Sequence, residues 1–191
     1  MICGPMCYVM PLPDLASPWK EFLEELDSLL DEPFSLHCIG GFAVVMGYGL
    51  PRATNDLDYR TVIPYNRIND LQRMAGPGSG LARKHKVYLQ RPGVDILPEN
   101  YEERIRELFP GHFKNLHLFI PDAYDLVLSK ISRNAPRDRE DVEYLAKTER
   151  LESAILLERF EKELKVQLIG SPAYHQRTLE FWIEAYFPKA S

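Results

Sequence analysis

Two aspartates separated by a single leucine close the segment GGFAVVMGYGLPRATNDLDY, which runs from Gly40 to Tyr59. Side chains two residues apart on a strand point to the same face, so we expect Asp56 and Asp58 to project together. Two carboxylates this close repel each other, and in a cleft they require a compensating cation. Hard divalent ions prefer such oxygen ligands, which makes Mg²⁺ or Mn²⁺ the natural candidate. An exposed acidic strand end is the alternative interpretation of the pair.

A third acid, Asp95, lies in the apolar segment GVDIL, which we predict to be a short strand beside the strand of Asp56. A carboxylate in apolar company points to a function more strongly than one on a polar surface. Three carboxylates on neighbouring strands would form a two-metal site. One ion would activate an attacking hydroxyl while the other holds the triphosphate of a nucleotide, and together they would stabilise both ends of an in-line displacement.

The paired glycines Gly40 and Gly41 open a predicted helix directly after an apolar strand. Because glycine has no side chain, phosphate oxygens can approach the backbone N–H groups there. The start of a helix also carries a partial positive charge that favours anions. The glycines therefore fit a pocket that binds the phosphates of the same nucleotide.

These residues together resemble the nucleotidyltransferase superfamily that includes DNA polymerase beta. The residues that carry the resemblance are Gly40, Gly41 and the helix after them, Arg52, Thr54, Asp56, Asp58 and, later, Asp95. Within the superfamily the chain is most similar to the minimal nucleotidyltransferases related to the AbiEii toxins of bacterial abortive-infection systems. The similarity extends from about Leu36 to Leu145, and its specific part is the segment Gly40 to Tyr59.

The resemblance implies a strand-helix-strand palm in which Asp56, Asp58 and Asp95 bind metal and are catalytic. The residues that it assigns to nucleotide binding are Gly40, Gly41, Arg52 and Thr54. The implied reaction transfers a nucleoside monophosphate from a nucleoside triphosphate (NTP) to an RNA acceptor, tRNA included, or to a protein hydroxyl. The resemblance also implies a toxin or phage-defence role, with a cognate antitoxin as partner.

One residue departs from the family pattern. Many members carry a serine directly after the paired glycines, where its hydroxyl helps to hold phosphate, and this chain has Phe42. We therefore expect phosphate binding either to be weaker or to shift to Arg52 and to backbone amides.

The predicted helix DAYDLVLSKISRN places Lys130 on the same face as its apolar residues, among them Leu126 and Ile131. A lysine in this position commonly snorkels, with its stem buried and its ammonium group in water. In the toxin-like branch a lysine on the equivalent helix faces the nucleotide. The resemblance therefore assigns Lys130 a catalytic and nucleotide-binding role, in which it binds phosphate as a point charge.

Two further acids, Asp138 and Asp141, lie in the segment PRDREDVEYL. They fit a capping arrangement with Asp138 as the N-cap and Asp141 as its companion, which requires no catalysis. The resemblance includes an acid after the lysine, and Asp141 is the better match, which assigns it to nucleotide binding. The nearby Arg133, Arg137 and Arg139 are either contacts for RNA or triphosphate, or solvated charges at a helix junction.

Apolar spacing predicts the elements that position these residues. A helix at WKEFLEELDSLLDE has Ser17 as N-cap and Pro18 at its first position, and it ends at Pro33. The strand SLHCIG and a helix of about residues 42–48, closed by Gly49, follow. Further strands are predicted at NDLDYRTVI, KHKVYLQ, GVDIL and HLFI, with a helix at NRINDLQRMA and a loop at GPGSG.

From Pro121 onward the pattern is helical, in DAYDLVLSKISRN, REDVEYLAKTE, LESAILLERFEKELKVQL and PAYHQRTLEFWIEAYF. Strands first and helices last predict an α+β fold, here a nucleotidyltransferase-like mixed β-sheet backed by helices with a helical C-terminal part. We predict a loose N-terminal segment at 1–16, a palm domain at 17–120, and the helical part, packed on the same domain, at 121–191.

Composition limits the partners and the compartment. The formal net charge of −5 over 191 residues excludes a uniformly basic surface, so nucleic acid would need a local cationic patch. One candidate patch comprises Arg83, Lys84, Lys86 and Arg91, for which a solvated strand edge is the alternative. No apolar run approaches the roughly 18 to 20 residues that cross a bilayer, and the N-terminus does not resemble a secretory signal. The odd count of three cysteines suits a reducing cytoplasm.

Two other kinds of function remain open on the sequence. A relative that keeps the metal carboxylates could act as a nucleotide sensor or as an inhibitory partner of another protein, which is consistent with Phe42. The carboxylates could also belong to a purely structural protein. Magnesium-dependent NTP binding is expected of the enzyme and of the sensor, but not of the structural protein. Turnover of the NTP is expected of the enzyme alone.

Overall fold

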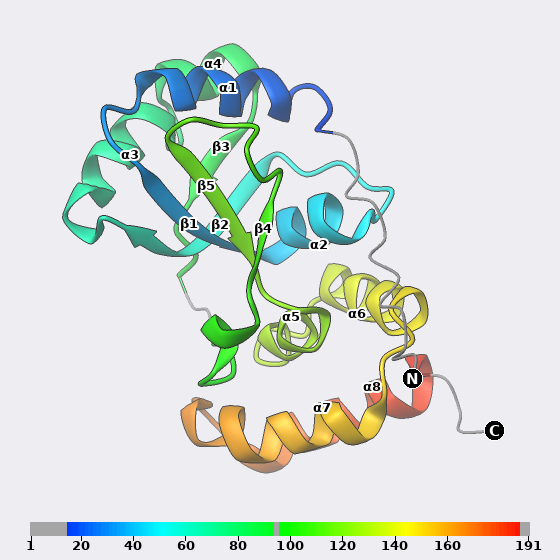
Figure 1. Cartoon of the computed structure of the whole chain (residues 1–191). Helices are drawn as coiled ribbons and strands as arrows, with labels where there is room; N and C mark the ends of the chain where they lie inside the picture. The colour runs from blue at the N-terminus through cyan, green and yellow to red at the C-terminus, as the bar shows by residue number, and fades with distance from the viewer. Residues whose placement is uncertain (1–14, 94–95, 188–191) are drawn as a thin grey trace, which may run out of the picture.

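The computed structural model describes residues 15–93 and 96–187, and it contains a mixed sheet of five strands (Figure 1). The strands are β1 (Phe34–Ile39), β2 (Asp56–Ile63), β3 (Tyr88–Gln90), β4 (Arg106–Leu108) and β5 (Leu116–Ile120). Their order across the sheet is β3-β2-β1-β5-β4. The central strand β1 pairs with β2 antiparallel and with β5 parallel, β2 pairs with β3 parallel, and β4 pairs with β5 antiparallel.

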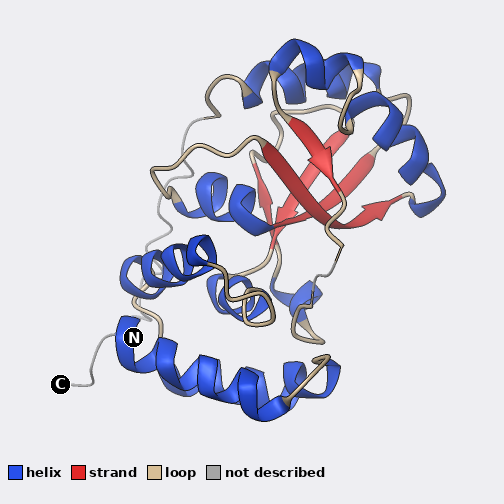
Figure 2. Cartoon of the chain, turned by 180° about the vertical axis from the view of Figure 1, so that it is seen from behind, coloured by secondary structure: helices blue, strands red, loops and turns tan. Residues whose placement is uncertain are grey.

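The helices fall into two groups on opposite sides of the molecule (Figures 1 and 2). The first group contains α1 (Trp19–Leu29), α3 (Ile68–Ala75) and α4 (Gly80–His85). The second contains α5 (Ala123–Ser129), α6 (Pro136–Thr148), α7 (Ser153–Arg159) and α8 (Pro172–Tyr186). Between the groups lies α2 (Gly40–Tyr48), which contacts the sheet as well as α5 and α6. The predicted α+β fold, with a mixed sheet and a helical C-terminal part, is confirmed.

The two faces of β2 have different surroundings. Leu57 and Tyr59 are fully buried in the main core, whereas Asp56 and Asp58 are half-buried on the other face. This alternation is the period of two that a strand imposes. The second face also carries Ile39, which packs with a small apolar group from the segment after residue 96. The strand therefore separates the core from the face on which the carboxylates lie.

Helix α2 is apolar around its whole circumference because it is enclosed on several sides. Phe42 and Val44 are fully buried, and the ring of Phe42 meets that of Trp19 edge to face, with 4.8 Å between the centroids. Gly49 ends the helix in the left-handed conformation with φ of 74°, as predicted for a glycine at this position. Apolar burial thus fixes the axis of α2, and with it the direction in which its first backbone N–H groups point.

Several predicted boundaries are wrong. Helix α1 begins at Trp19, one residue later than predicted, and Pro18 occupies its N-cap position; the hydroxyl of Ser17 donates to the side chain of Glu21 instead of capping the helix. Part of GPGSG and of KHKVYLQ forms α4, which Ser79 caps by accepting a hydrogen bond from Ala82 N–H at 3.1 Å. The glycines around this cap favoured a loop in the sequence.

The basic patch is also different from the predicted strand edge. Arg83 and Lys84 lie on α4, and Lys84 pairs with Glu25 of α1 at 2.6 Å. Strand β3 is limited to Tyr88–Gln90, and β4 had not been predicted. Cys38 is fully buried, as expected of a core residue, while Cys3 and Cys7 lie outside the described residues. Among the helices of the described ranges, none combines the length and the apolar character that a membrane span requires.

Candidate active site

The two aspartates lie where three strands and one helix meet. Asp56 begins β2, and Asp58 pairs with Ile39 at the end of β1, directly before α2 begins. On its other side Asp58 pairs with Gln90 of β3. Both carboxylates line a cavity of about 470 Å³, together with Gly40 and Lys130. The sheet therefore presents the predicted pair to a pocket.

Gly40 is required at the floor of this pocket for two reasons. Its φ of +68° lies in the left-handed region, which side chains other than glycine adopt at a cost. A Cβ atom at this position would also lie 2.5 Å from Oδ2 of Asp58. Glycine therefore allows the carboxylate of Asp58 to sit directly against the start of α2.

The next glycine faces a different pair of side chains. A Cβ atom on Gly41 would lie 3.2 Å from Nη2 of Arg52 and 3.7 Å from the hydroxyl of Thr54. The hydroxyl of Thr54 donates to Asp56, whose Oδ1 lies 3.0 Å and whose carbonyl oxygen lies 3.1 Å from it. Thr54 thereby fixes the orientation of the Asp56 carboxylate, and Arg52 is held over the N-terminus of α2.

A buried ion pair connects the two halves of the chain at this point. The ammonium group of Lys130 donates to Oδ2 of Asp141 at 2.7 Å, and Oδ1 of Asp141 lies 2.8 Å from Nη2 of Arg52. The side chains of Lys130 and Asp141 are 3 % and 2 % exposed, whereas that of Arg52 is 24 % exposed. The snorkelling interpretation of Lys130 is therefore wrong, because its ammonium group is buried against an acid from α6.

A second acid of α6 neighbours the same lysine. Asp138 is fully buried, its Oδ1 lies 3.9 Å from Nζ of Lys130, and Arg133 donates to both of its oxygens at 2.8 and 2.6 Å. Burial opposes ionisation of Asp138, but the hydrogen bonds from Arg133 and from Ala135 N–H and the charge of Lys130 outweigh it, so the pKa of this carboxyl is lowered. We call Arg52, Lys130, Arg133, Asp138 and Asp141 the pocket cluster.

Asp138 does not have the predicted N-cap role. Helix α6 begins at Pro136, so Ala135 is the N-cap and Asp138 is the third helical residue. From there its carboxylate accepts a hydrogen bond from Ala135 N–H at 2.9 Å. The proline at the first helical position, which favours a helix start, was the signal that would have placed the cap correctly.

The predicted site residues divide into three groups. Gly40, Asp56, Asp58 and Lys130 line the pocket. Gly41, Arg52, Thr54 and Asp141 lie beside it and are linked to it by the contacts above. Asp95 lies outside the described residues, and the described residues of GVDIL that follow it, Ile96 and Leu97, are not in a strand.

The residue after the paired glycines does not face the pocket. Phe42 is fully buried in the main core, where it packs against Trp19. The departure from the family pattern at this position therefore contributes to the core rather than to the pocket wall.

Sequence reasoning missed part of the pocket wall. Gln90, Ser129 and Ser132 line it. Arg133 lines it as well, a residue for which contact with RNA or triphosphate and a solvated charge had both been considered. The side chain of Arg133 is 69 % exposed, and its guanidinium group is nevertheless paired with Asp138. The position of Gln90 follows from pairing β3 with β2, whereas the serines become visible only when α5 is placed against the sheet.

The donor atoms of this pocket suit a hard divalent cation. Asp56 and Asp58 present carboxylate oxygens from one face of one strand, which is the ligand type that Mg²⁺ and Mn²⁺ prefer. Across residues 15–93 and 96–187, no group of three or more histidine, cysteine, aspartate or glutamate side chains is arranged to hold a metal ion. The two aspartates thus fit as part of a ligand set whose predicted third member, Asp95, is outside these ranges.

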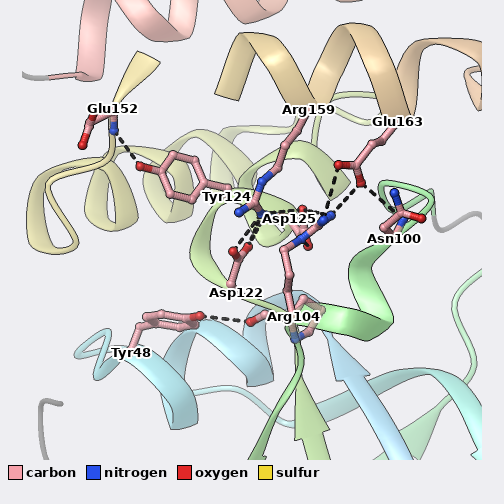
Figure 3. A network of polar contacts seen from close by, with 10 residues as sticks. Tyr48, Asn100, Arg104, Asp122, Tyr124, Asp125, Glu152, Arg159 and Glu163 are labelled. Carbon is pink, nitrogen blue, oxygen red and sulfur yellow. Dashed lines mark hydrogen bonds and ion pairs between the residues drawn. The ribbon is translucent and has the colours of Figure 1, made fainter. Parts of the chain in front are cut away.

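A second ionic group lies apart from the pocket, between α5 and α7 (Figure 3). Asp125 is fully buried and accepts hydrogen bonds from Arg104 at 2.9 and 3.2 Å and from Arg159 at 2.9 Å. Arg159 also donates to Asp122, and Arg104 donates to Glu163 at 2.7 Å. We call these five residues the scaffold cluster, because none of them lines the pocket.

Comparison with protein families identifies the family to which the chain belongs. Residues 19–187 match the family described as "Nucleotidyltransferase of unknown function (DUF6036)". The match spans most of the chain, and the protein belongs to this family of nucleotidyltransferases. Comparisons with curated proteins and with solved structures gave no match.

Proposed function

We propose that this protein transfers a nucleoside monophosphate from an NTP to a hydroxyl of an acceptor, with Mg²⁺ or Mn²⁺ bound by Asp56 and Asp58. The observation that supports this most directly is that the two carboxylates, the glycine floor and Lys130 line one pocket. Membership in a nucleotidyltransferase family supports the same reaction class. The ion would neutralise charge that develops on the phosphates during transfer.

The start of α2 and Arg52 are suited to hold the triphosphate. The first backbone N–H groups of α2 open at Gly40 and Gly41, where no side chain blocks an anion. Arg52 is beside Gly41, and its partly exposed guanidinium group pairs with the buried Asp141 at 2.8 Å and, at 3.5 Å, with the exposed Glu140. A triphosphate that displaces Glu140 would meet a planar fork of donors that matches phosphate oxygens. Binding here would leave the α-phosphate near the aspartates, with the pyrophosphate directed toward Arg52.

Lys130 has a different task from Arg52. Its ammonium group is buried and donates to Asp141, and Asp141 in turn holds Arg52. Removing the lysine charge would leave a buried carboxylate with one cationic partner fewer, which raises the cost of burying it. We therefore assign Lys130 the positioning of Arg52 through Asp141, in addition to the positive potential that it adds to the pocket wall.

A role in defence is supported by sequence resemblance alone. The segment Gly40 to Tyr59 resembles minimal nucleotidyltransferases related to AbiEii-type toxins. We propose accordingly that the protein acts as a toxin or phage-defence component that is held in check by a cognate antitoxin. Expression of the protein in a bacterial host, with and without its neighbouring genes, would show whether growth arrest depends on Asp58.

A transfer assay tests the proposed reaction. The wild-type protein, incubated with Mg²⁺ and α-phosphate-labelled NTPs, is expected to label cellular RNA or protein, and Asp58→Ala is expected to abolish the label. Asp31→Ala is the matched control, because the side chain of Asp31 is 71 % exposed and lies outside the pocket. Equal labelling by wild type and Asp58→Ala would contradict the proposal. NTP binding in calorimetry without any transfer would identify a nucleotide-binding module instead.

A further inference from the structure

A second, smaller pocket lies on the same face of the sheet as the aspartates. Its volume is about 270 Å³, and its walls include Arg60 of β2, Leu97, Tyr101 and Val166. Leu97 and Tyr101 are buried, whereas Val166 is 79 % exposed at the rim. The guanidinium group of Arg60 lies over the ring of Tyr101, 5.5 Å from its centroid. The pocket therefore has a firm floor and an open, partly apolar rim.

The chain connects this second pocket directly to the candidate active site. Asp56, Asp58 and Arg60 are alternate residues of β2, and the step from Asp58 to Arg60 is roughly 7 Å at the rise of a strand. The pairing with β1 shifts between Tyr59 and Thr61, so Arg60 is the extra residue of a β-bulge, and it is half-buried like the two aspartates. Ile96 lines the larger pocket and Leu97 the smaller one. The two pockets thus follow each other along the same strand and the same loop.

The order of the side chains along β2 indicates which side of the aspartates holds the triphosphate and which side the acceptor. Arg52 and Thr54 precede the aspartates and lie against Gly41, where we place the triphosphate. Arg60 follows the aspartates along β2, at the end of this row that lies away from Arg52. In phosphoryl transfer the attacking and the leaving oxygen are roughly in line across the phosphorus. If the pyrophosphate leaves toward Arg52, the attacking oxygen has to arrive from the side of Arg60.

The walls of the second pocket are held firmly in place. The backbone N–H of Asn100 donates to Glu163 at 3.2 Å, and Arg104 joins Glu163 to Asp125 (Figure 3). Glu163 belongs to a π-helical turn, Phe160–Leu164, of the kind that is frequent at functional sites. The scaffold cluster therefore fixes the loop of residues 97–104 against the segment that carries Val166.

The charges around the rim indicate which class of acceptor fits. The exposed Glu99 lines the pocket together with one cation, Arg60, and two more exposed acids, Glu102 and Glu103, follow Tyr101 in the turn Tyr101–Arg104. The acids outnumber the arginine, in a chain whose net charge is −5. A polyanionic RNA backbone would be repelled there, whereas basic side chains would be attracted. Val166 lines the pocket and is 79 % exposed, so it offers apolar contact to a peptide. We propose that the second pocket is the acceptor site, and that the acceptor is a protein whose serine, threonine or tyrosine hydroxyl is flanked by basic residues.

This proposal rests on the proposed function and specifies its reaction. The acceptor hydroxyl oxygen forms a bond to the α-phosphorus of the NTP, and the bond from that phosphorus to the bridging oxygen of the β-phosphate breaks. The hydroxyl proton passes to water and pyrophosphate leaves. The product is a phosphodiester between the protein side chain and the nucleoside, and no oxidant or further reactant is needed.

The test uses the full chain, Mg²⁺, α-phosphate-labelled NTPs, total cellular RNA, and a peptide library in which a central serine, threonine or tyrosine has randomised neighbours. Labelled peptides are expected to be enriched in arginine and lysine beside the hydroxyl. Two variants probe the rim: Glu102→Lys with Glu103→Lys, and Val166→Asp. The matched control is Glu180→Lys with Glu184→Lys, which reverses two exposed charges on α8, outside both pockets.

We expect the Glu102→Lys and Glu103→Lys protein to show a KM for basic peptides raised about tenfold, with the KM for NTP unchanged and the control unaffected. Val166→Asp is expected to raise the peptide KM without lowering the melting temperature. Labelling of RNA alone would overturn the acceptor proposal while leaving the transferase function intact. An equal rise of the peptide KM in the Glu180→Lys and Glu184→Lys control would also overturn the acceptor proposal. If the wild type shows no NTP-dependent labelling of any acceptor, the proposed transferase function itself is overturned.

Discussion

The pocket cluster and the scaffold cluster both bury an aspartate against an arginine, yet the pKa of the buried carboxyl shifts in opposite directions in the two clusters. Asp138 and Asp125 are each fully buried and each accept a two-pronged contact from a guanidinium group. The pKa of Asp138 is lowered, because Arg133, Ala135 N–H and Lys130 outweigh its desolvation. The pKa of Asp125 is raised, because desolvation dominates and the charge of Asp122 adds to it.

The difference shows how similar ion pairs acquire different roles. In the pocket cluster three cations, Arg52, Lys130 and Arg133, share two acids, and Lys130 and Arg133 border the cavity that Asp56 and Asp58 also line. In the scaffold cluster three acids share two arginines, and the group has no contact with the larger cavity. The first arrangement is suited to hold a ligand, and the second to hold chain segments together.

The largest expected effect comes from breaking one buried pair in each cluster. Lys130→Met and Arg104→Met each remove a cation from a buried acid, and each is expected to lower the free energy of unfolding by roughly 3 to 5 kcal/mol. Urea denaturation measures this loss. At a temperature where both variants are folded, only Lys130→Met is expected to lose Mg²⁺-dependent NTP binding in calorimetry. Equal loss of NTP binding in both variants would remove the functional distinction between the clusters.

A smaller effect is expected for the contact between Arg52 and Asp141. A double-mutant cycle of Arg52→Met and Asp141→Asn is expected to give a coupling energy of roughly 1 to 3 kcal/mol, because the two side chains form one ion pair whose acid is buried. The matched cycle in the scaffold cluster combines Arg159→Met with Asp122→Asn. NTP affinity is expected to fall only in the cycle that includes Arg52. An unchanged affinity would show that Arg52 does not contact the triphosphate.

Gly40→Ala is expected to cost roughly 1 to 2 kcal/mol, because alanine is strained at a positive φ. Gly49→Ala is the matched control, since Gly49 has φ of +74° and its nearest neighbour, the hydroxyl of Tyr144, would be 3.6 Å from the new Cβ. Gly40→Ala should lose at least as much stability as Gly49→Ala in thermal melts, because its Cβ also meets Oδ2 of Asp58. Only Gly40→Ala displaces the Asp58 carboxylate, so only this variant should lose transfer activity. Full activity in Gly40→Ala would argue against Asp58 as a metal ligand.

The smallest effect is a difference in pH dependence. A lowered folded pKa means that the charge of Asp138 stabilises the protein above the ordinary aspartate value of 3.8 and that this contribution is lost as the pH falls through the folded pKa. For Asp125 the sign is opposite: its contribution is complete below 3.8 and is lost as the pH rises through the raised pKa. Stability of wild type relative to Asp138→Asn and to Asp125→Asn should therefore change in opposite directions on acidification. Parallel curves would contradict the assigned shifts.

Local spacing was sufficient for the elements on which the aspartates lie. The alternation in DLDY predicted that Asp56 and Asp58 share a face, and β2 confirms it with Leu57 and Tyr59 buried behind them. Gly49 was predicted to close the helix that follows the glycine pair, and it does so. These features depend on contacts within a few residues, so the sequence contains the information needed to predict them.

Other features were missed because their cause lies far away in the chain. Helix periodicity placed Lys130 on the apolar face of a helix predicted to run to Asn134, whereas α5 ends at Ser129 and Lys130 is its C-cap. Periodicity also gave no indication that Asp141 would meet the ammonium group. The role of Arg133 likewise depends on where α6 begins, and the wall formed by Gln90 and Ser132 depends on which elements pack together. Asp95 was assigned to a strand by its apolar neighbours, and the structure describes no strand at Ile96 or Leu97.

The sequence by itself determined the fold class, from the order of its strands and helices, and the shared direction of Asp56 and Asp58, from the period of a strand. The structure added the reason for glycine at position 40, which is its positive φ and its closeness to the carboxylate of Asp58. Only the tertiary structure decided that the buried Lys130 and Asp141 and the partly exposed Arg52 form one chain of charges, and that Arg60 lines a second pocket beyond Asp58. The reason is that burial and pairing of a charge depend on which distant segment supplies the opposite charge, and local spacing carries no information about that segment.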